Sequence, residues 1–201
     1  MSCSKSVVRE KMSALRDGYE KTWLEECSSK VCTNILKSSY YKNAQKIFAY
    51  LAFGNEVNVD SVISQALSDG KIVYVPHIVL EQKGIIQPVR LKSFADIVLG
   101  KYDIRTVRQP LEAALPSDMD VILTPGLCFD RTGVRMGLGA GFYDRLLAKS
   151  GSVFKIGVTL SPQIVKSVPS EEHDVLMDCL VYENGFIICN NKVNSGGENI
   201  G

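Results

Sequence analysis

The fold is decided by one stretch of the chain, Thr124-Pro-Gly-Leu-Cys-Phe-Asp-Arg-Thr-Gly-Val-Arg-Met-Gly-Leu-Gly-Ala-Gly-Phe-Tyr-Asp-Arg145. A strand is expected to end at Pro125, and a helix is expected to begin near Gly141. Residues 126–140 lie between them, which is more than a simple connection needs. Loops of that length in compact domains are usually functional or disordered. Because this loop carries acidic, aromatic and basic side chains, we expect the active site to form around Arg135–Asp144.

Glycine occupies every second position within this segment, at Gly137, Gly139 and Gly141. Glycine allows positive φ and a close approach of the backbone to a ligand. Successive N–H groups can then wrap an anion, and the following helix offers its positive end to the same anion. Arg135 adds a planar donor suited to phosphate, and Arg145 could add a second cation. The spacing fits neither a Walker A loop nor a Rossmann fingerprint. The alternative is a flexible loop that needs glycine only for its turns.

Short apolar runs alternate with amphipathic segments along the rest of the chain. The expected helices and strands are helices over residues 5–16, 20–37, Asp60–Ser68 and Phe142–Lys149, and strands over Lys46–Leu51, Lys71–Val75, Ile85–Leu91, Val121–Thr124, Lys155–Thr159, Leu180–Tyr182 and Phe186–Cys189. This alternation predicts a single α/β domain over residues 1–189. We expect a mostly parallel central sheet with helices on both faces, a Rossmann-like three-layer sandwich. The polar residues 190–201 are expected to form a disordered tail.

The composition excludes several classes of protein. The net charge is +1, with 23 basic and 22 acidic residues, which argues against a nucleic-acid binder. Apolar stretches are too short to span a bilayer, and the first residues carry no apolar signal core, so we expect a cytoplasmic protein that does not bind membranes. Six cysteines without a CxxC pair and only two histidines make a zinc site improbable. We therefore expect reduced cysteines that pack as small hydrophobic residues.

Charged side chains elsewhere could complete a nucleotide site. Lys5 and Arg9 are spaced i, i+4 on the first expected helix, so they share a face, although a solvated basic face is the ordinary reading. Asp144 and Asp174 could hold Mg²⁺ together with phosphate oxygens. Asp144 could equally be a charge that stabilises the helix start, and Asp174 could be a surface acid. Glu56 follows the first strand, where ligands bind in open α/β sheets, but it could be a loop acid.

Read together, these segments resemble the 5-formyltetrahydrofolate cyclo-ligase family, also called methenyltetrahydrofolate synthetase. The resemblance runs from Lys5 to about Glu183. Its most specific part is Pro125-Gly-Leu-Cys-Phe-Asp followed by Arg135-Met-Gly-Leu-Gly-Ala-Gly-Phe-Tyr-Asp-Arg145, which is similar to the family's glycine-rich pattern. Weaker matches are the basic pair of the first helix, the Asn55-Glu56 turn, and His173-Asp174 with Asp178.

The resemblance implies the reaction of ATP with 5-formyltetrahydrofolate, free or polyglutamylated, to give 5,10-methenyltetrahydrofolate, ADP and phosphate. It implies a phosphorylated imine intermediate, a monomeric enzyme and a requirement for Mg²⁺. Carried over residue by residue, Arg135 and Tyr143 would be catalytic, and Asp144 and Asp174 would bind Mg²⁺. The substrate would contact Leu51, Glu56 and Tyr143. ATP would contact Lys5, Arg9, Arg135, Met136, Gly137, Leu138, Gly139, Ala140, Gly141, Phe142 and Tyr143.

The sequence departs from the family pattern inside the loop. Phe142 replaces the first tyrosine of a Tyr-Tyr pair. Leu138 lies where many members have a basic or aromatic residue, and Ala140 lies where many have glycine or a basic residue, so neither position is charged here. Phosphate binding would therefore depend more on Arg135, Lys5 and Arg9. Two other functions remain open from the sequence. One is a sugar-phosphate isomerase of similar architecture, and the other is a non-catalytic nucleotide- or folate-binding module.

Overall fold

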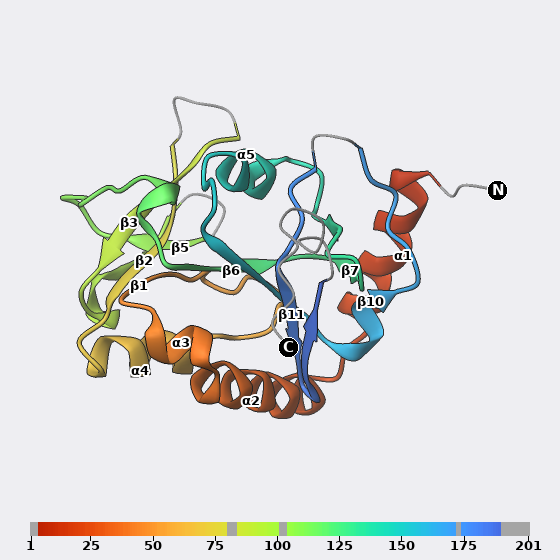
Figure 1. The fold of residues 1–201 in the computed structure, drawn as a ribbon, viewed down its shortest axis with the longest axis horizontal. Helices are drawn as coiled ribbons and strands as arrows, with labels where there is room; N and C mark the ends of the chain where they lie inside the picture. The colour runs from red at the N-terminus through yellow and green to blue at the C-terminus, as the bar shows by residue number, and fades with distance from the viewer. Residues whose placement is uncertain (1–3, 80–83, 101–103, 172–173, 190–201) are drawn as a thin grey trace, which may run out of the picture.

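A seven-stranded sheet runs through the centre of the computed structural model, which describes residues 4–79, 84–100, 104–171 and 174–189 (Figure 1). Its strands are β1 (Lys46–Phe48), β2 (Ile72–Ile78), β3 (Ile86–Leu91), β6 (Val121–Pro125), β9 (Phe154–Val158), β11 (Cys179–Tyr182) and β12 (Gly185–Ile188). They lie in the order β12-β11-β9-β6-β1-β2-β3. The five inner strands are parallel, and the two edge strands, β12 and β3, are antiparallel to their neighbours. The predicted α/β class with a mostly parallel sheet is confirmed.

Helices cover both faces of this sheet, as predicted (Figure 1). One face packs against α2 (Lys21–Lys37), α3 (Ser39–Asn43) and α4 (Asp60–Ser68), and the other packs against α5 (Phe142–Ala148). The apolar spacing of α2 places Val31 and Ile35 in the core, where both are almost fully buried. The short α3 was not predicted, because five residues are too few to show a helical period.

A second, three-stranded sheet lies beside the main one and is absent from the sequence prediction. It consists of β7 (Cys128–Asp130), β8 (Arg135–Met136) and β10 (Ile164–Val165), in the order β10-β7-β8. The first helix, α1 (Lys5–Asp17), packs on this small sheet through Met12. Part of the expected loop is therefore a β-hairpin, and its turn is fixed by the buried Asp130 carboxylate, which accepts backbone N–H bonds from Thr132 and Val134.

The remaining short elements surround the edges of the main sheet. They are the strands β4 (Ile97–Leu99) and β5 (Arg105–Val107) and the 3-10 turns η1 (Phe94–Asp96), η3 (Pro116–Asp118) and η4 (Ser161–Gln163). The predicted division into a domain of residues 1–189 and a disordered tail is not tested by the fold, and residues 190–201 lie outside the described part of the chain.

Two strand boundaries were predicted wrongly, and the first is that of the strand expected over Lys46–Leu51, which ends at Phe48. Pro76 was expected to end the second strand, but β2 continues through it to Ile78. Pro76 faces Pro88 of β3 in the antiparallel register, and the neighbouring β1 has already ended at Phe48. Because a proline has no N–H to donate, it is tolerated where the strand on that side is missing.

The order of the strands places a topological switch point, called the crevice below, at the carboxyl ends of β1 and β6. From β1 the chain passes through α4 to β2 on one side, whereas from β6 it passes through α5 to β9 on the other. The connections therefore diverge between these two central strands. Ligands of open α/β sheets bind at such a switch point.

Gly157 of β9 provides a test of how tightly this central region is packed. A Cβ at this position would lie 2.7 Å from Phe129 Cε1 and 2.7 Å from Leu180 Cδ2. We expect Gly157→Ala to lower the free energy of unfolding by about 1–3 kcal/mol, as overpacking does. Gly18→Ala is the control, because its Cβ would meet nothing closer than 3.5 Å. Urea unfolding that gave equal stability for both variants would contradict the packing described.

Candidate active site

Three predicted site residues from distant parts of the chain meet at the crevice between β1 and β6. Arg135 lies in β8, with its guanidinium carbon 5.7 Å from the centre of the Tyr143 ring on α5. The Glu56 carboxylate, from the turn after β1, is close enough to act on the Tyr143 hydroxyl electrostatically. Burial raises the pKa of Tyr143 above its ordinary value, Glu56 adds to that rise, and Arg135 opposes it.

The Arg135 side chain is the most tightly held cation of the site. It is only 4% exposed, and it donates one hydrogen bond to the carbonyl of Pro125 at 3.2 Å. A second bond, from Nη2, reaches the carboxylate of Asp144. One guanidinium therefore ties the end of β6 to the first turn of α5. A fork fixed in this way is preorganised to present its remaining N–H groups to an anion.

The glycine segment passes directly over this cation. A Cβ on Gly137 would lie 2.8 Å from Arg135 Nη1, so a larger residue there would displace the guanidinium. Gly139 and Gly141 have φ angles of +103° and +70°, which other residues rarely adopt. The expectation that glycine is needed here for backbone geometry is confirmed at these two positions. Leu138 and Ala140, which alternate with the glycines, are exposed.

Helix α1 approaches the same segment from the other side. The Nε atom of Arg9 donates to the carbonyl of Gly137 at 3.3 Å. Lys5, one turn earlier, forms ion pairs with Glu171 at 3.0 Å and Asp174 at 3.3 Å. These carboxylates raise the pKa of Lys5 against the opposing effect of its burial. The structure thus brings together the predicted Lys5, Arg9 and Asp174 at one end of the glycine segment.

Arg145, which the sequence suggested as a second phosphate-binding cation, bonds to two backbone carbonyls in the structure. Its guanidinium donates to the carbonyl of Ala140 and, through Nε, to the carbonyl of Gly84 at 2.8 Å. The bond to Ala140 closes the glycine segment onto the start of α5, and the bond to Gly84 joins α5 to the turn before β3. Arg145 therefore shapes the backbone of the loop.

The two predicted metal-binding acids are each bound to a predicted phosphate-binding cation. Asp144 is 55% exposed and bonded to Arg135 through Oδ1, and Asp174 is bonded to Lys5 through Oδ2. Within the described ranges, His, Cys, Asp and Glu do not form a group of three or more that could hold a metal ion. The donors nevertheless suit Mg²⁺, which usually takes one or two carboxylates together with substrate phosphates and water.

The second half of the crevice follows β1. Leu51 is buried, and the Glu56 side chain is 14% exposed. One Glu56 oxygen accepts a hydrogen bond from the backbone N–H of Phe53 at 3.0 Å, and the other lies 3.5 Å from Nη1 of Arg16. Burial raises the pKa of Glu56, while the Phe53 hydrogen bond and the Arg16 charge lower it. The result is a recessed carboxylate that can accept N–H donors from a polar ligand.

Sequence reasoning missed Arg16. Arg16 is buried on α1 and forms an ion pair with Glu56, which lies 40 residues later in the sequence. The signal was present, because Lys5, Arg9, Met12 and Arg16 are spaced i, i+4, i+7 and i+11. Residues at that spacing lie on one face of a helix.

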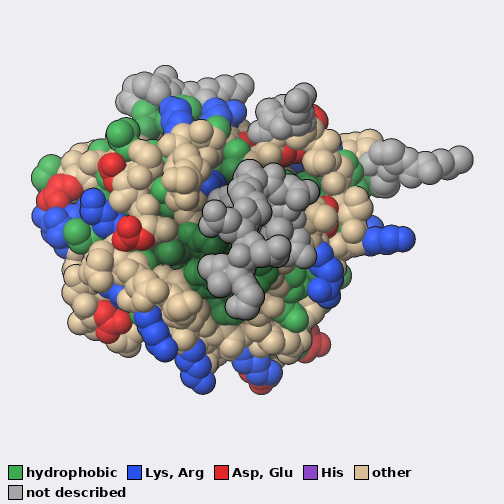
Figure 2. Space-filling model, in the orientation of Figure 1, with side chains coloured by type: hydrophobic (Ala, Val, Ile, Leu, Met, Phe, Trp, Pro, Cys, Tyr) green, Lys and Arg blue, Asp and Glu red, His purple; other side chains and the backbone are tan. Residues whose placement is uncertain are grey.

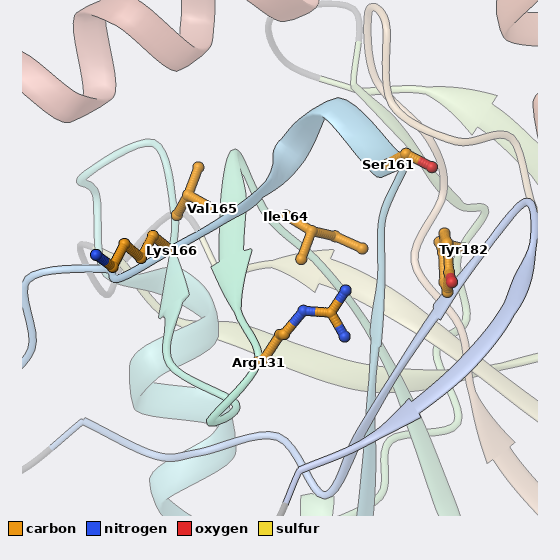
Figure 3. Close-up of a pocket in the computed structure, with 6 residues that line it drawn as sticks. All are labelled: Arg131, Ser161, Ile164, Val165, Lys166 and Tyr182. Atoms are coloured by element: carbon orange, nitrogen blue, oxygen red, sulfur yellow. The ribbon is translucent and has the colours of Figure 1, made fainter.

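A separate cavity of about 410 Å³ lies near the carboxyl ends of β9 and β11 (Figure 3). Arg131, Ile164 and Tyr182 point toward one another across it, and the Lys166 side chain extends away from Tyr182. Its lining contains two cations and lacks a carboxylate. None of the residues predicted for the site lines this cavity. We therefore place the candidate site at the crevice, on the basis of its convergent charged groups.

Other reactive groups among the described residues are cysteines and His77. Five described cysteines are free and buried, in agreement with the expectation that they pack as small hydrophobic residues. His77 Nδ1 lies 2.9 Å from the Thr106 hydroxyl, at the opposite side of the sheet from β9.

Helices in the described ranges are too short or too polar to cross a membrane. Lysine and arginine side chains are scattered over the face in Figure 2 instead of forming one patch.

The fold and the crevice define an open-sheet α/β protein in which a glycine-rich loop and a recessed carboxylate meet at the switch point of the sheet. Residues 1–183 match the 5-formyltetrahydrofolate cyclo-ligase family. The chain belongs to this family of enzymes, as the glycine-rich motif indicated.

Individual relatives agree with this assignment. A probable 5-formyltetrahydrofolate cyclo-ligase from Caenorhabditis elegans is 28% identical over 92% of this chain and 95% of its own length. The Mus musculus 5-formyltetrahydrofolate cyclo-ligase is 29% identical over 75% of this chain and 79% of its own. The solution structure of Aquifex aeolicus 5,10-methenyltetrahydrofolate synthetase superposes with a TM-score of 0.84 at 27% identity, covering 96% of both chains.

Substitution of Gly139 tests whether the loop geometry matters for function. Gly139→Ala places a methyl group on a backbone with φ of +103°, and we expect it to weaken nucleotide binding by about tenfold through local strain. Gly151→Ala is the matched control, because Gly151 also has a positive φ of +57° but lies after α5, outside the glycine segment, so this variant should bind nearly as wild type does. Calorimetric titration with Mg-ATP measures both. Equal affinity for wild type and Gly139→Ala would show that the loop conformation is dispensable.

Proposed function

We propose that the chain converts 5-formyltetrahydrofolate to 5,10-methenyltetrahydrofolate, using ATP and releasing ADP and phosphate. The observation that carries this proposal is the meeting of a buried guanidinium, a glycine backbone and a recessed carboxylate at one crevice. The first two suit a triphosphate, and the third suits a heterocycle with N–H donors. Membership of the cyclo-ligase family supports the choice of substrates.

The nucleotide is proposed to lie along the glycine segment. Arg135 donates to the terminal phosphates, and Lys5 and Arg9 approach from α1. The contacting residues are Met136, Gly137, Leu138, Gly139, Ala140, Gly141, Phe142 and Tyr143. The folate is proposed to lie against Leu51 and the Tyr143 ring, with its heterocycle facing Glu56. Tyr143 then lies between the two substrates, next to the atoms that react.

The chemistry needs no protein nucleophile. The formyl oxygen of the folate attacks the γ-phosphorus, the bond to the bridging oxygen breaks, and ADP leaves with that electron pair. N10 then attacks the phosphorylated imine carbon and loses its proton to solvent, and the C–O bond breaks to release inorganic phosphate, giving the closed methenyl ring. The residues contribute positioning and charge stabilisation. Arg135 stabilises the charge that develops on the transferred phosphoryl group.

Asp144 and Asp174 are proposed to hold Mg²⁺ with the nucleotide. The ion would neutralise phosphate charge when bound. Asp144 has an exposed carboxylate beside Arg135, and Asp174 is presented beside Lys5, so both acids lie next to the cations that bind the nucleotide. We further propose that the enzyme is a cytoplasmic monomer that binds neither nucleic acid nor membranes and accepts free or polyglutamylated folate.

Replacement of Arg135 tests the core of this proposal. We expect Arg135→Ala to reduce turnover by about a hundredfold or more, because it removes the main charge at the developing phosphoryl transition state. The assay follows methenyl absorbance after mixing protein, Mg-ATP and 5-formyltetrahydrofolate. Arg131→Ala is the control, since Arg131 is exposed in the nearby β7–β8 turn. Undiminished methenyl formation by a folded Arg135→Ala protein would remove Arg135 from the mechanism.

Asp144 can be assigned to the metal or to the helix by its effect on Mg²⁺ dependence. If it helps to hold the ion, Asp144→Asn should raise the Mg²⁺ concentration for half-maximal activity by about tenfold. Exposed Asp17→Asn is the charge-matched control. A changed KM for ATP at saturating Mg²⁺, with unchanged Mg²⁺ dependence, would instead mean that Asp144 acts only by orienting Arg135.

A further inference from the structure

One face of α1 contacts both halves of the crevice. Lys5 and Arg9 reach Asp174 and the glycine segment, and Met12 packs on the small sheet. Arg16, at the last turn of the same face, reaches Glu56. A helix is a rigid spacer of about 1.5 Å per residue. Side chains on this face therefore have a fixed separation along the crevice.

The link between Arg16 and the Glu56 turn has two parts. The guanidinium lies 3.5 Å from Glu56 Oε1, with the two side chains only 7% and 14% exposed. The Arg16 carbonyl also accepts a hydrogen bond from the Asn55 side chain at 3.1 Å. Both the backbone and the side chain of Arg16 thus hold the turn that carries Glu56. Contacts of this kind orient a carboxylate, and the carboxylate itself binds the ligand.

The Arg16 guanidinium also has a hydrogen-bond donor without a partner among the described residues. Its Nε–H and the hydroxyl of Tyr19 are buried without a hydrogen-bond partner among the described residues. Buried polar atoms in folded proteins nearly always have a partner. The bond to Glu56 therefore leaves one N–H of the guanidinium unused among the described residues.

We propose that Arg16 is a positioning residue for the second substrate: it holds the Glu56 carboxylate against the folate heterocycle from the same helix face that presents Lys5 and Arg9 to the nucleotide. This inference rests on the proposed function of Glu56. In this arrangement α1 sets the spacing between the two substrates. The loss of Arg16 should therefore impair folate binding while leaving nucleotide binding intact.

The first experiment compares Arg16→Met with Lys11→Met, an exposed substitution on the same helix. We expect Arg16→Met to raise the KM for 5-formyltetrahydrofolate by about tenfold, the effect of one charge-assisted hydrogen bond. The KM for ATP should stay within twofold of the wild-type value. If the wild type is active and Arg16→Met has the same KM for folate, the inference about Arg16 is wrong but the proposed function stands. If the wild type is inactive, the proposed function itself is wrong.

The second experiment separates positioning from a purely structural role. In a double-mutant cycle with Glu56→Gln, the effect of Arg16→Met on folate binding should disappear, because its target carboxylate is gone. Arg16→Lys should restore part of the affinity. Additive effects in the cycle would contradict positioning through Glu56. Direct folate titration without ATP and thermal unfolding of each variant distinguish a defect in folate binding from a loss of stability.

The pH dependence of folate binding gives an independent readout. The charged and titratable groups around Glu56 are Arg16 of α1, Tyr143 of α5 and Tyr50 after β1. Without Arg16, the pKa of the buried Glu56 rises further. When the pH is lowered, Glu56 of the variant therefore becomes protonated at a higher pH than Glu56 of the wild type. Arg16→Met should therefore lose folate affinity at a higher pH than wild type. Superimposable pH profiles would contradict the inference.

Discussion

The guanidinium of Arg135 is the constraint on which the rest of the site depends. It is almost fully buried, and it bridges the carbonyl at the end of β6, the Asp144 carboxylate and the Tyr143 ring. Removing a charge from water costs several kcal/mol unless partners compensate for it. The protein supplies those partners at the point where its strand connections diverge, so the cation lies where a ligand of an open sheet binds.

The other parts of the crevice can be understood from this position. Glycine is required at Gly137 because a Cβ would meet the guanidinium, and at Gly139 and Gly141 because of their backbone angles. Arg145 fastens the end of the segment to the start of α5. The uncharged Leu138 and Ala140 add no cations of their own, so the basic charge comes from Arg135 and α1. The site is assembled from a rigid hairpin and two helices, which suits a reaction controlled by positioning.

The sequence predicted the parts of the fold that repeat with a clear period. Helices α1, α2 and α4 and the inner strands were found because apolar residues recur at helical or alternating spacing. The hairpin of β7 and β8 was missed because its strands are only two or three residues long and its turn depends on the buried Asp130. The glycine segment was recognised because composition alone marks it. Arg16 was not, because its value comes from a contact with Glu56 that only the tertiary structure creates.

In the proposed reaction, the crevice delivers the γ-phosphoryl group of ATP to the formyl oxygen of the folate. Following that oxygen tests the claim most directly. The substrate is prepared with ¹⁸O in the formyl group and turned over with Mg-ATP in ordinary water, and the released phosphate is analysed by mass spectrometry. We predict that the label appears in inorganic phosphate, with one ¹⁸O for each methenyl group formed. Unlabelled phosphate, with the heavy oxygen lost to water, would contradict it.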